Sequence, residues 1–251
     1  MAMARDARER DSRRSSGFTL VELLVVVSII CLLMSVMLPS LTRAQKQGEQ
    51  LHCLGNQHQL FLTWMLYVTK NDDHLCDSLT SLRACAPSED IFICKTVQQD
   101  SARSRGSSYG LSNTLGGAFR DGVQPYERFH KISHAGDCLV FTDIQSVSAE
   151  CFWPLLRDPE QKRWLWRPPD LAGLGGITNR HGNGCNMTFA DGHGEMVRWK
   201  DQRTLQLIKG TIADEIAASQ ENADLDFLVR VLVGDRPVHN ESEEGESTDG
   251  I

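Results

Sequence analysis

The feature that most constrains this chain is a single apolar segment close to its amino terminus. Residues 18–38 contain no Lys or Arg, and their few polar members are Thr19, Glu22, Ser28 and Ser35. As an α-helix that rises 1.5 Å per residue, the segment would be about 32 Å long, which is enough to cross the hydrocarbon core of a bilayer. The sequence therefore predicts one transmembrane helix.

Charged residues on the two sides of this segment predict its orientation. Residues 1–17 contain five Arg, whereas only two basic residues, Arg43 and Lys46, lie just after the segment. Because positively charged flanks stay in the cytoplasm, we predict a single-pass protein of the inner (cytoplasmic) membrane, in contact with lipid, whose main body is exported to the periplasm or cell surface. An ordinary cleaved secretory signal fits less well, because its apolar core is shorter and ends at a small-x-small site.

The main body of the chain is acidic. The formal net charge is −7, and the Arg-rich first 17 residues leave the remainder more negative still. A surface that binds nucleic acid needs clustered Lys and Arg to face the phosphates. The composition therefore predicts no nucleic-acid partner.

A carboxylate lies inside the apolar segment, in the string Gly17-Phe18-Thr19-Leu20-Val21-Glu22. Such a residue is costly in a membrane and usually has a function. Phe18 and Glu22 are four residues apart and share one helix face, and cleavage after Gly17 would place a new ammonium group at Phe18. In a bundle of such helices, the amino terminus of one copy can pair with Glu22 of the next. The alternative is a plain signal anchor in which Glu22 reaches the interfacial water.

This string resembles the class III signal of type IV pilins and type II secretion pseudopilins. The resemblance implies that prepilin peptidase cuts after Gly17 and methylates the new amino terminus at Phe18. It also implies that Glu22 acts in assembly with other pilin-like subunits, on an inner-membrane secretion or pilus assembly platform.

A second set of residues lies near the carboxyl-terminal third of the chain. Nine residues separate His181 from Asp191-Gly192. The spacing resembles the H-x9-DG element associated with prepilin processing in a large pilin-like family, and residues 53–60 and 108–113 resemble other blocks of that family. The chain departs from the family at residues 92–95, where Cys-Pro is common.

The residues around this element predict a β-hairpin. Residues 185–190 and 195–199 are the two expected strands, joined by the Asp191-Gly192 turn. In this arrangement His181 would hydrogen-bond near Asp191 and hold the ends of the hairpin together. The alternative is a metal site formed by His181, Asp191 and His193, because imidazole and carboxylate groups are suitable ligands for zinc.

Residues beyond the membrane segment predict a long helix packed on a small head. Spacings of three and four extend over residues 40–70, and Leu54, Phe61 and Val68 widen the apolar stripe that they form. We expect the head to cover this stripe, whose main members are Leu41, Ala44, Gly48, Leu51, Gly55, His58, Leu62, Met65 and Thr69. Short apolar runs at residues 91–93, 138–141 and 187–190 predict strands. The expected fold class is α+β, pilin-like, with an antiparallel sheet in the head.

The expected domain boundaries follow from these segments. They are a leader at 1–17, a transmembrane and assembly helix at 18–39, an amphipathic continuation at 40–70, a globular head at 71–235 and a disordered acidic tail at 236–251. Export to an oxidising compartment permits disulfides. A Cys53–Cys94 bridge would tie the helix to the head, whereas reduced thiols would pack as small apolar side chains.

These features predict a structural subunit that is processed and assembled into a type II secretion or type IV pilus-like fibre. We expect no cofactor and no enzymatic activity. One alternative is a membrane-anchored metal-dependent enzyme or binding protein that uses His181, Asp191 and His193. Another is a surface adhesin that is processed like a pilin and does not polymerise.

Overall fold

The computed structural model describes residues 18–95, 97, 106–117, 120–145, 151–158, 160–167, 174–210 and 221–238. The predicted leader with Gly17, and all but residues 236–238 of the predicted tail, lie outside these ranges. The chain forms two compact units, Met1–Gln45 and Lys46–Ile251, which we describe separately. We use "head" for the described residues after Lys70.

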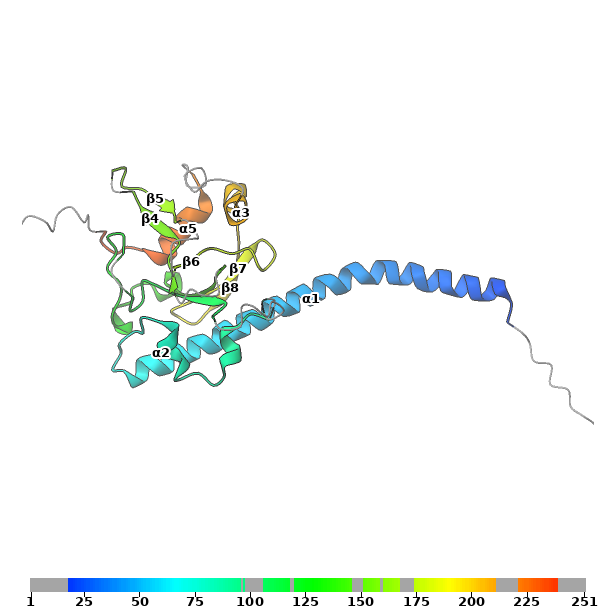
Figure 1. Ribbon diagram of the computed structural model, residues 1–251, viewed down its shortest axis with the longest axis horizontal. Coiled ribbons are helices and arrows are strands. Elements are labelled where there is room, and N and C mark those ends of the chain that lie inside the picture. Colours follow the sequence, from blue (N-terminus) through cyan, green and yellow to red (C-terminus); the bar gives the residue numbers. More distant parts are fainter. Residues whose placement is uncertain are drawn as a thin grey trace, which may run out of the picture. The chain divides into compact units, whose positions relative to one another are not determined.

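One long helix, α1 (Leu20–Lys70), confirms the predicted amino-terminal helix (Figure 1). Pro39 lies inside α1 and does not end it. In the first unit the large apolar side chains between Leu20 and Leu38 are all exposed, by 45% or more. By length and composition this part of α1 is able to cross a membrane.

The head contains a six-stranded mixed sheet in the order β6-β3-β1-β2-β7-β8. The pairs β1–β2, β2–β7 and β7–β8 are antiparallel, whereas β3 pairs in parallel with β1 and with β6. The strands are β1 (Tyr109–Ser112), β2 (Leu139–Asp143), β3 (Cys151–Phe152), β6 (Leu174–Gly175), β7 (Gly184–Phe189) and β8 (Gly194–Arg198). An antiparallel pair, β4 (Leu155–Arg157) and β5 (Trp164–Trp166), forms a second small sheet. The α+β class is confirmed, with parallel edge strands that the sequence did not predict.

The predicted strands of the head have mixed outcomes. The hairpin is confirmed, since Gly184 pairs with Arg198 and Thr188 with Gly194 in the β7–β8 ladder. The strand predicted at residues 91–93 is wrong, because Glu89–Phe92 form the 3-10 helix η1. The Ser88 side chain accepts a hydrogen bond from the backbone N–H of Asp90 and caps this turn. Local capping therefore outweighed the β-propensity of two buried apolar residues.

The buried face of α1 shares Val68 with the predicted one and otherwise differs from it. The head covers a face whose buried residues are Cys53, Asn56, Gln57, Leu60, Thr63, Trp64 and Val68. In the predicted stripe, Leu51 and Leu62 are instead exposed by 66% and 54%. The physical reason is that Asn56 and Gln57 find hydrogen-bond partners in the head, so a polar pair can be buried there at little cost.

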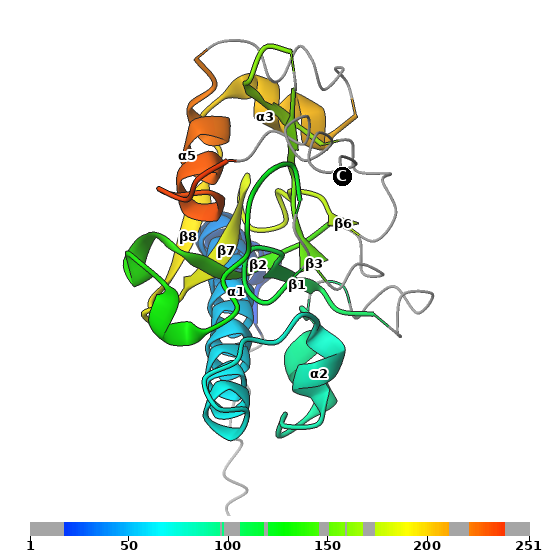
Figure 2. The same ribbon diagram turned by 90° about the vertical axis from the view of Figure 1, so that its left-hand side faces the viewer.

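Two apolar clusters fill the head. One joins α1 through Leu60 and Trp64 to Phe92 and Phe141, and the other joins the sheet through Phe152 and Phe189 to the carboxyl-terminal helices. Figure 2 shows these helices, α3 (Gln202–Ile208) and α5 (Ala223–Leu232), at the end of the head away from the short helix α2 (Leu79–Arg83). Two further 3-10 turns are η3 (Phe129–Lys131) and η4 (Ala135–Asp137).

Candidate functional site

The amino-terminal end of α1 is closed by Thr19 and Glu22. The Glu22 carboxylate accepts hydrogen bonds from the Thr19 backbone N–H at 2.9 Å and from its hydroxyl at 2.8 Å. The Thr19 hydroxyl oxygen in turn accepts from the Glu22 backbone N–H at 3.3 Å. This reciprocal pattern is a capping box. This cap was not among the predicted features, although Thr-x-x-Glu before an apolar run is its signature.

The predicted processing residues lie just before this cap. Phe18 is non-helical and 73% exposed, whereas Gly17 is outside the described residues. The exposed, non-helical position of Phe18 is compatible with a peptidase substrate. Cleavage after Gly17, methylation of Phe18 and the assembly role of Glu22 stay predictions.

Cys53, Cys94 and His181 meet between α1 and the head. The Cys53 and Cys94 Sγ atoms are 2.7 Å apart, and His181 Nε2 lies 3.8 Å from Cys94 Sγ. All three side chains are buried, and their ligand-type atoms lie within 4.8 Å of one another. The contact with Cys94 is the larger cause and burial the smaller cause of a raised pKa of the Cys53 thiol. The set can form a disulfide or hold a soft metal ion, and the predicted Cys53–Cys94 bridge stays a prediction.

Asp143, at the end of β2, is the acidic neighbour of this cluster. Its Oδ2 atom lies 3.6 Å from His181 Nε2 and accepts the Asn186 backbone N–H at 2.7 Å. Burial raises the pKa of Asp143 to about 6, although His181 and the Asn186 N–H oppose this shift. Burial alone lowers the pKa of His181, but its contacts with Cys94 and Asp143 outweigh burial and raise it.

Gln57 connects this acidic group to helix α1. Its amide nitrogen donates to Asp143 Oδ1 at 3.3 Å and to the Asn186 backbone oxygen at 3.1 Å. Its amide oxygen accepts from the Thr188 hydroxyl at 3.0 Å. Sequence reasoning missed Gln57 and Asp143. The sequence offered two signals for them. Asp143 is a carboxylate at the end of an apolar strand, and Gln57 follows Cys53 by one helical turn.

The structure separates His181 from the other residues of the predicted metal site. Asp191 instead bonds to His193, whose Nδ1 lies 2.6 Å from Asp191 Oδ1, in the exposed turn between β7 and β8. His193 also stacks on the Phe189 ring at 4.4 Å. Within the described ranges, the one group of three or more metal-ligating side chains is Cys53, Cys94 and His181. The predicted contact of His181 with Asp191 and the metal set with His193 are therefore corrected.

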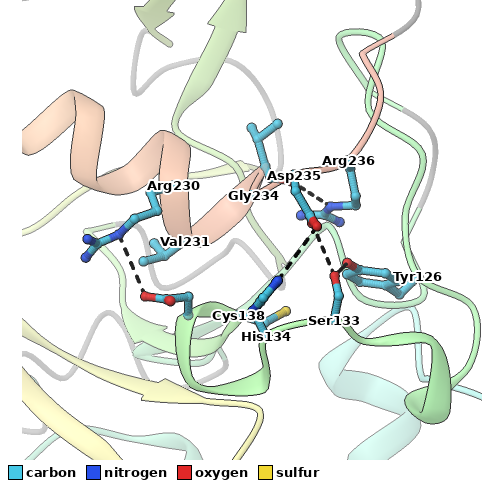
Figure 3. A pocket seen from close by; sticks show the side chains of 11 residues that line it. Tyr126, Ser133, His134, Cys138, Arg230, Val231, Gly234, Asp235 and Arg236 are labelled. Atoms are coloured by element: carbon cyan, nitrogen blue, oxygen red, sulfur yellow. Dashed lines mark hydrogen bonds and ion pairs between the residues drawn. The ribbon is translucent and has the colours of Figure 1, made fainter.

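A hollow of about 350 Å³ near the end of α5 is a further candidate site (Figure 3). Its polar side chains are engaged with one another: Ser133 donates to Asp235 at 3.2 Å, and His134 lies 3.9 Å from the same carboxylate. Burial raises the pKa of Cys138 to about 11, so little thiolate is present at neutral pH. The lining therefore supplies no activated nucleophile.

The comparisons with known proteins concern the amino-terminal segment. Neither the search of curated proteins nor the search of solved structures found a match. Residues 12–38 match the family model described as the prokaryotic N-terminal methylation motif. This match covers the charged approach, Gly17 and the apolar segment, and it supports a type IV pilin-like processed subunit. The H-x9-DG element remains a resemblance. The chain thus carries a type IV pilin-like prepilin signal at the start of a single long apolar helix.

Proposed function

We propose that this chain is a structural subunit of a type II secretion or type IV pilus-like fibre. Prepilin peptidase cuts it after Gly17 and methylates Phe18, and an inner-membrane platform then assembles it with other pilin-like subunits. The head is exported while the first half of α1 stays in the membrane. We propose no catalytic role and no cofactor for the head.

The observation that carries this proposal is the methylation motif at the start of α1, whose residues between Leu20 and Leu38 are apolar except for Glu22, Ser28 and Ser35. The exposed side chains between Leu20 and Leu38 need lipid or other helices around them. A membrane provides the first environment, and a bundle of identical helices provides the second. Transfer between the two environments is what fibre assembly requires of such a subunit.

The part of α1 in the second unit also keeps an apolar face uncovered. Leu51 and Leu62 are exposed, and a hollow of about 320 Å³ is lined by Leu51, Leu54, Gly55, His58, Thr188, Gly192 and Gly194. At Gly48 and Gly55 an added Cβ would meet nothing within 4 Å. Small residues on one helix face allow two backbones to approach closely. The occupant that we propose is helix α1 of a second copy.

The acidic residue near the amino terminus completes this proposal. In the monomer the Glu22 carboxylate is held by Thr19, so its charge is hydrogen-bonded before assembly. After cleavage, the methylated ammonium group of a neighbouring copy can approach the same carboxylate. An ion pair in an apolar layer forms well only in one register, which would set the axial offset between subunits.

The test is intact mass and amino-terminal sequencing of the membrane-extracted protein from cells with and without prepilin peptidase. The expected result is an N-methylated Phe18 start that appears only with the peptidase. A start at Met1 or Ala2 in both strains would overturn the proposal and leave a plain signal anchor. A Phe18 start in both strains would assign the cut to another enzyme and would also count against it.

A further inference from the structure

We propose that a disulfide between Cys53 and Cys94 fastens helix α1 to the head, and that His181 is the base that activates Cys94 while this bond forms. The inference rests on the export that the proposed function requires, because disulfides persist in oxidising compartments. It gives His181 a chemical role that differs from holding a hairpin together.

The distance between the two sulfur atoms favours a bond over two separate thiols. The Sγ atoms are 2.7 Å apart. Non-bonded carbon atoms already keep about 3.5–4.0 Å apart, and sulfur is larger. A disulfide is about 2.05 Å long, so bond formation needs a smaller shift than separation of the two side chains to a normal contact.

The same distance decides between a disulfide and a metal ion. Cys53, Cys94 and His181 are suitable in type and proximity for zinc. However, two thiolates at about 2.3 Å from a tetrahedral zinc ion lie roughly 3.75 Å from each other. The pair would have to open by about 1 Å to admit the ion. The geometry therefore favours the covalent bond, and zinc becomes an outcome of the test.

His181 is placed to remove the proton of Cys94. Its Nε2 atom lies 3.8 Å from Cys94 Sγ and 3.6 Å from Asp143 Oδ2. The imidazolium formed by this transfer would face the Asp143 carboxylate, which stabilises it. The neighbouring cation, Arg180, donates to the backbone oxygens of Ser108 and Ile144. Tyr109 is the other ionisable group beside the two thiols.

The burial of the two thiols determines the order of the reaction steps. Cys53 and Cys94 are both 0% exposed, so an oxidant must reach them before α1 docks. Cys94 and His181 belong to the head, whereas Cys53 belongs to α1. Cys94 is therefore the thiol that can be activated first, and Cys53 closes the bond as the helix arrives.

The reaction that we propose is two successive thiol–disulfide exchanges. The Cys94 thiolate attacks a disulfide of an exported thiol–disulfide oxidoreductase, forms a mixed disulfide and releases one thiolate. Cys53 then attacks Cys94 Sγ and releases the second thiolate. The two released thiolates take up two protons. One comes from Cys94 by way of His181, and the other comes from Cys53. Two thiols are oxidised and one disulfide is reduced.

The first experiment maps the bond in the full-length, membrane-extracted wild-type protein. The protein is alkylated in denaturant without reductant, digested and analysed by mass spectrometry, with zinc measured in the same sample. We expect one peptide pair that joins Cys53 to Cys94. Alkylation of both residues, or one equivalent of zinc with both thiols reduced, would overturn the disulfide. The amino terminus is read in the same spectra, so a failure of processing after Gly17 is distinguishable.

The second experiment tests the base. The reduced full-length protein in detergent is reoxidised with oxidised glutathione, and His181→Gln is compared with His193→Gln, an exposed histidine of the β7–β8 turn. A neighbouring base that lowers a thiol pKa from about 8.5 to about 7 increases thiolate about 15-fold at pH 7, while lower nucleophilicity costs roughly fivefold. We therefore expect His181→Gln to slow bond formation about threefold at pH 7.

The pH dependence separates a base from a merely structural side chain. At pH 9 the thiols ionise without help and only the difference in nucleophilicity remains, so the rate of His181→Gln should match or exceed the rates of wild type and His193→Gln. Equal rates at pH 7 would overturn the role of His181. A His181→Gln rate that is reduced by the same factor at pH 7 and pH 9 would also overturn it, because it would report a folding defect.

Discussion

Gly192, in the turn between β7 and β8, lies directly against the ring of Phe61 on helix α1. Gly192 has a φ of +91°, and a Cβ added there would be 2.8 Å from Phe61 Cε1. Gly194 approaches Leu54 in the same way, with a Cβ position 2.8 Å from Leu54 Cδ1. The Asp-Gly turn of the hairpin therefore packs on the helix at a distance that a side chain would prevent.

We expect Gly192→Ala to lower the free energy of unfolding by about 2–4 kcal/mol, because it adds left-handed backbone strain to a steric clash. The measurement is chemical denaturation of the detergent-solubilised protein, followed by tryptophan fluorescence. The matched control is Gly210→Ala, since Gly210 has a φ of +68° with nothing within 4 Å of its Cβ position. This control should lose only the strain, about 1–2 kcal/mol. Equal losses in the two variants would contradict the role of the Phe61 contact.

The buried Asp143 carboxyl predicts a pH dependence of stability. Burial raises its pKa to about 6 in the folded protein, above the unfolded value of about 3.9. The stabilising contribution of the protonated form is therefore fully present below about pH 4 and is lost as the pH rises through 6, an effect of roughly 3 kcal/mol. The raised pKa of His181 acts in the same direction, because its contribution is also lost as the pH rises.

Asp143→Asn should flatten this dependence between pH 4 and pH 7, which denaturation curves at several pH values would measure. The control is Asp191→Asn. Asp191 is an exposed carboxylate, and although desolvation raises its pKa, its bonds to His193 outweigh that effect and hold the pKa below the usual range. Its contribution is present at higher pH and is lost as the pH falls, so the sign is opposite. An Asp143→Asn protein with the slope of the wild type would refute the assignment.

Sequence patterns predicted those parts of the fold whose signals are local. The long helix follows from an apolar run and its three- and four-residue spacings, and the β7–β8 hairpin follows from a short apolar run that ends at the Asp191-Gly192 turn. The strands β3 and β6 are two residues each, too short for any alternation to show. The turn η1 was missed because its Ser88 cap was not weighed against two β-formers.

The covered face of α1 and the site beside it required information from distant parts of the chain. Apolar spacing favoured Leu51 and Leu62, but Gln57 is buried because Asp143 and Asn186 satisfy its amide. His181 was assigned to Asp191 because the two share one motif, whereas the fold brings Asp143 and Cys94 to it. Such pairings depend on strand order and helix rotation, which no single stretch of sequence specifies.

Leu60 and Leu62 offer a direct test of which face of α1 packs on the head. Leu60 is fully buried and Leu62 is 54% exposed. We expect Leu60→Ala to cost about 2–5 kcal/mol of stability and Leu62→Ala to change it by less than about 0.5 kcal/mol. Under the proposed function, Leu62→Asp should fold normally and reduce the yield of sheared fibres. Similar destabilisation of both alanine variants would contradict this assignment of the buried and exposed faces of α1.

Thr19 and Glu22 allow the charge of the carboxylate to be separated from its capping role. Glu22→Gln removes the charge, but glutamine still supports a capping box. Thr19→Val removes the hydroxyl of the cap, keeps a β-branched side chain of similar size and leaves the carboxylate charged, at a helix-stability cost of about 0.5–2 kcal/mol. If Glu22 pairs with the amino terminus of a neighbour, Glu22→Gln should abolish fibres and Thr19→Val should retain them. Both variants should still be cut after Gly17, as intact mass would show. Fibres formed by Glu22→Gln at the wild-type level would exclude the ion pair, whereas loss of fibres in Thr19→Val alone would assign the requirement to the cap.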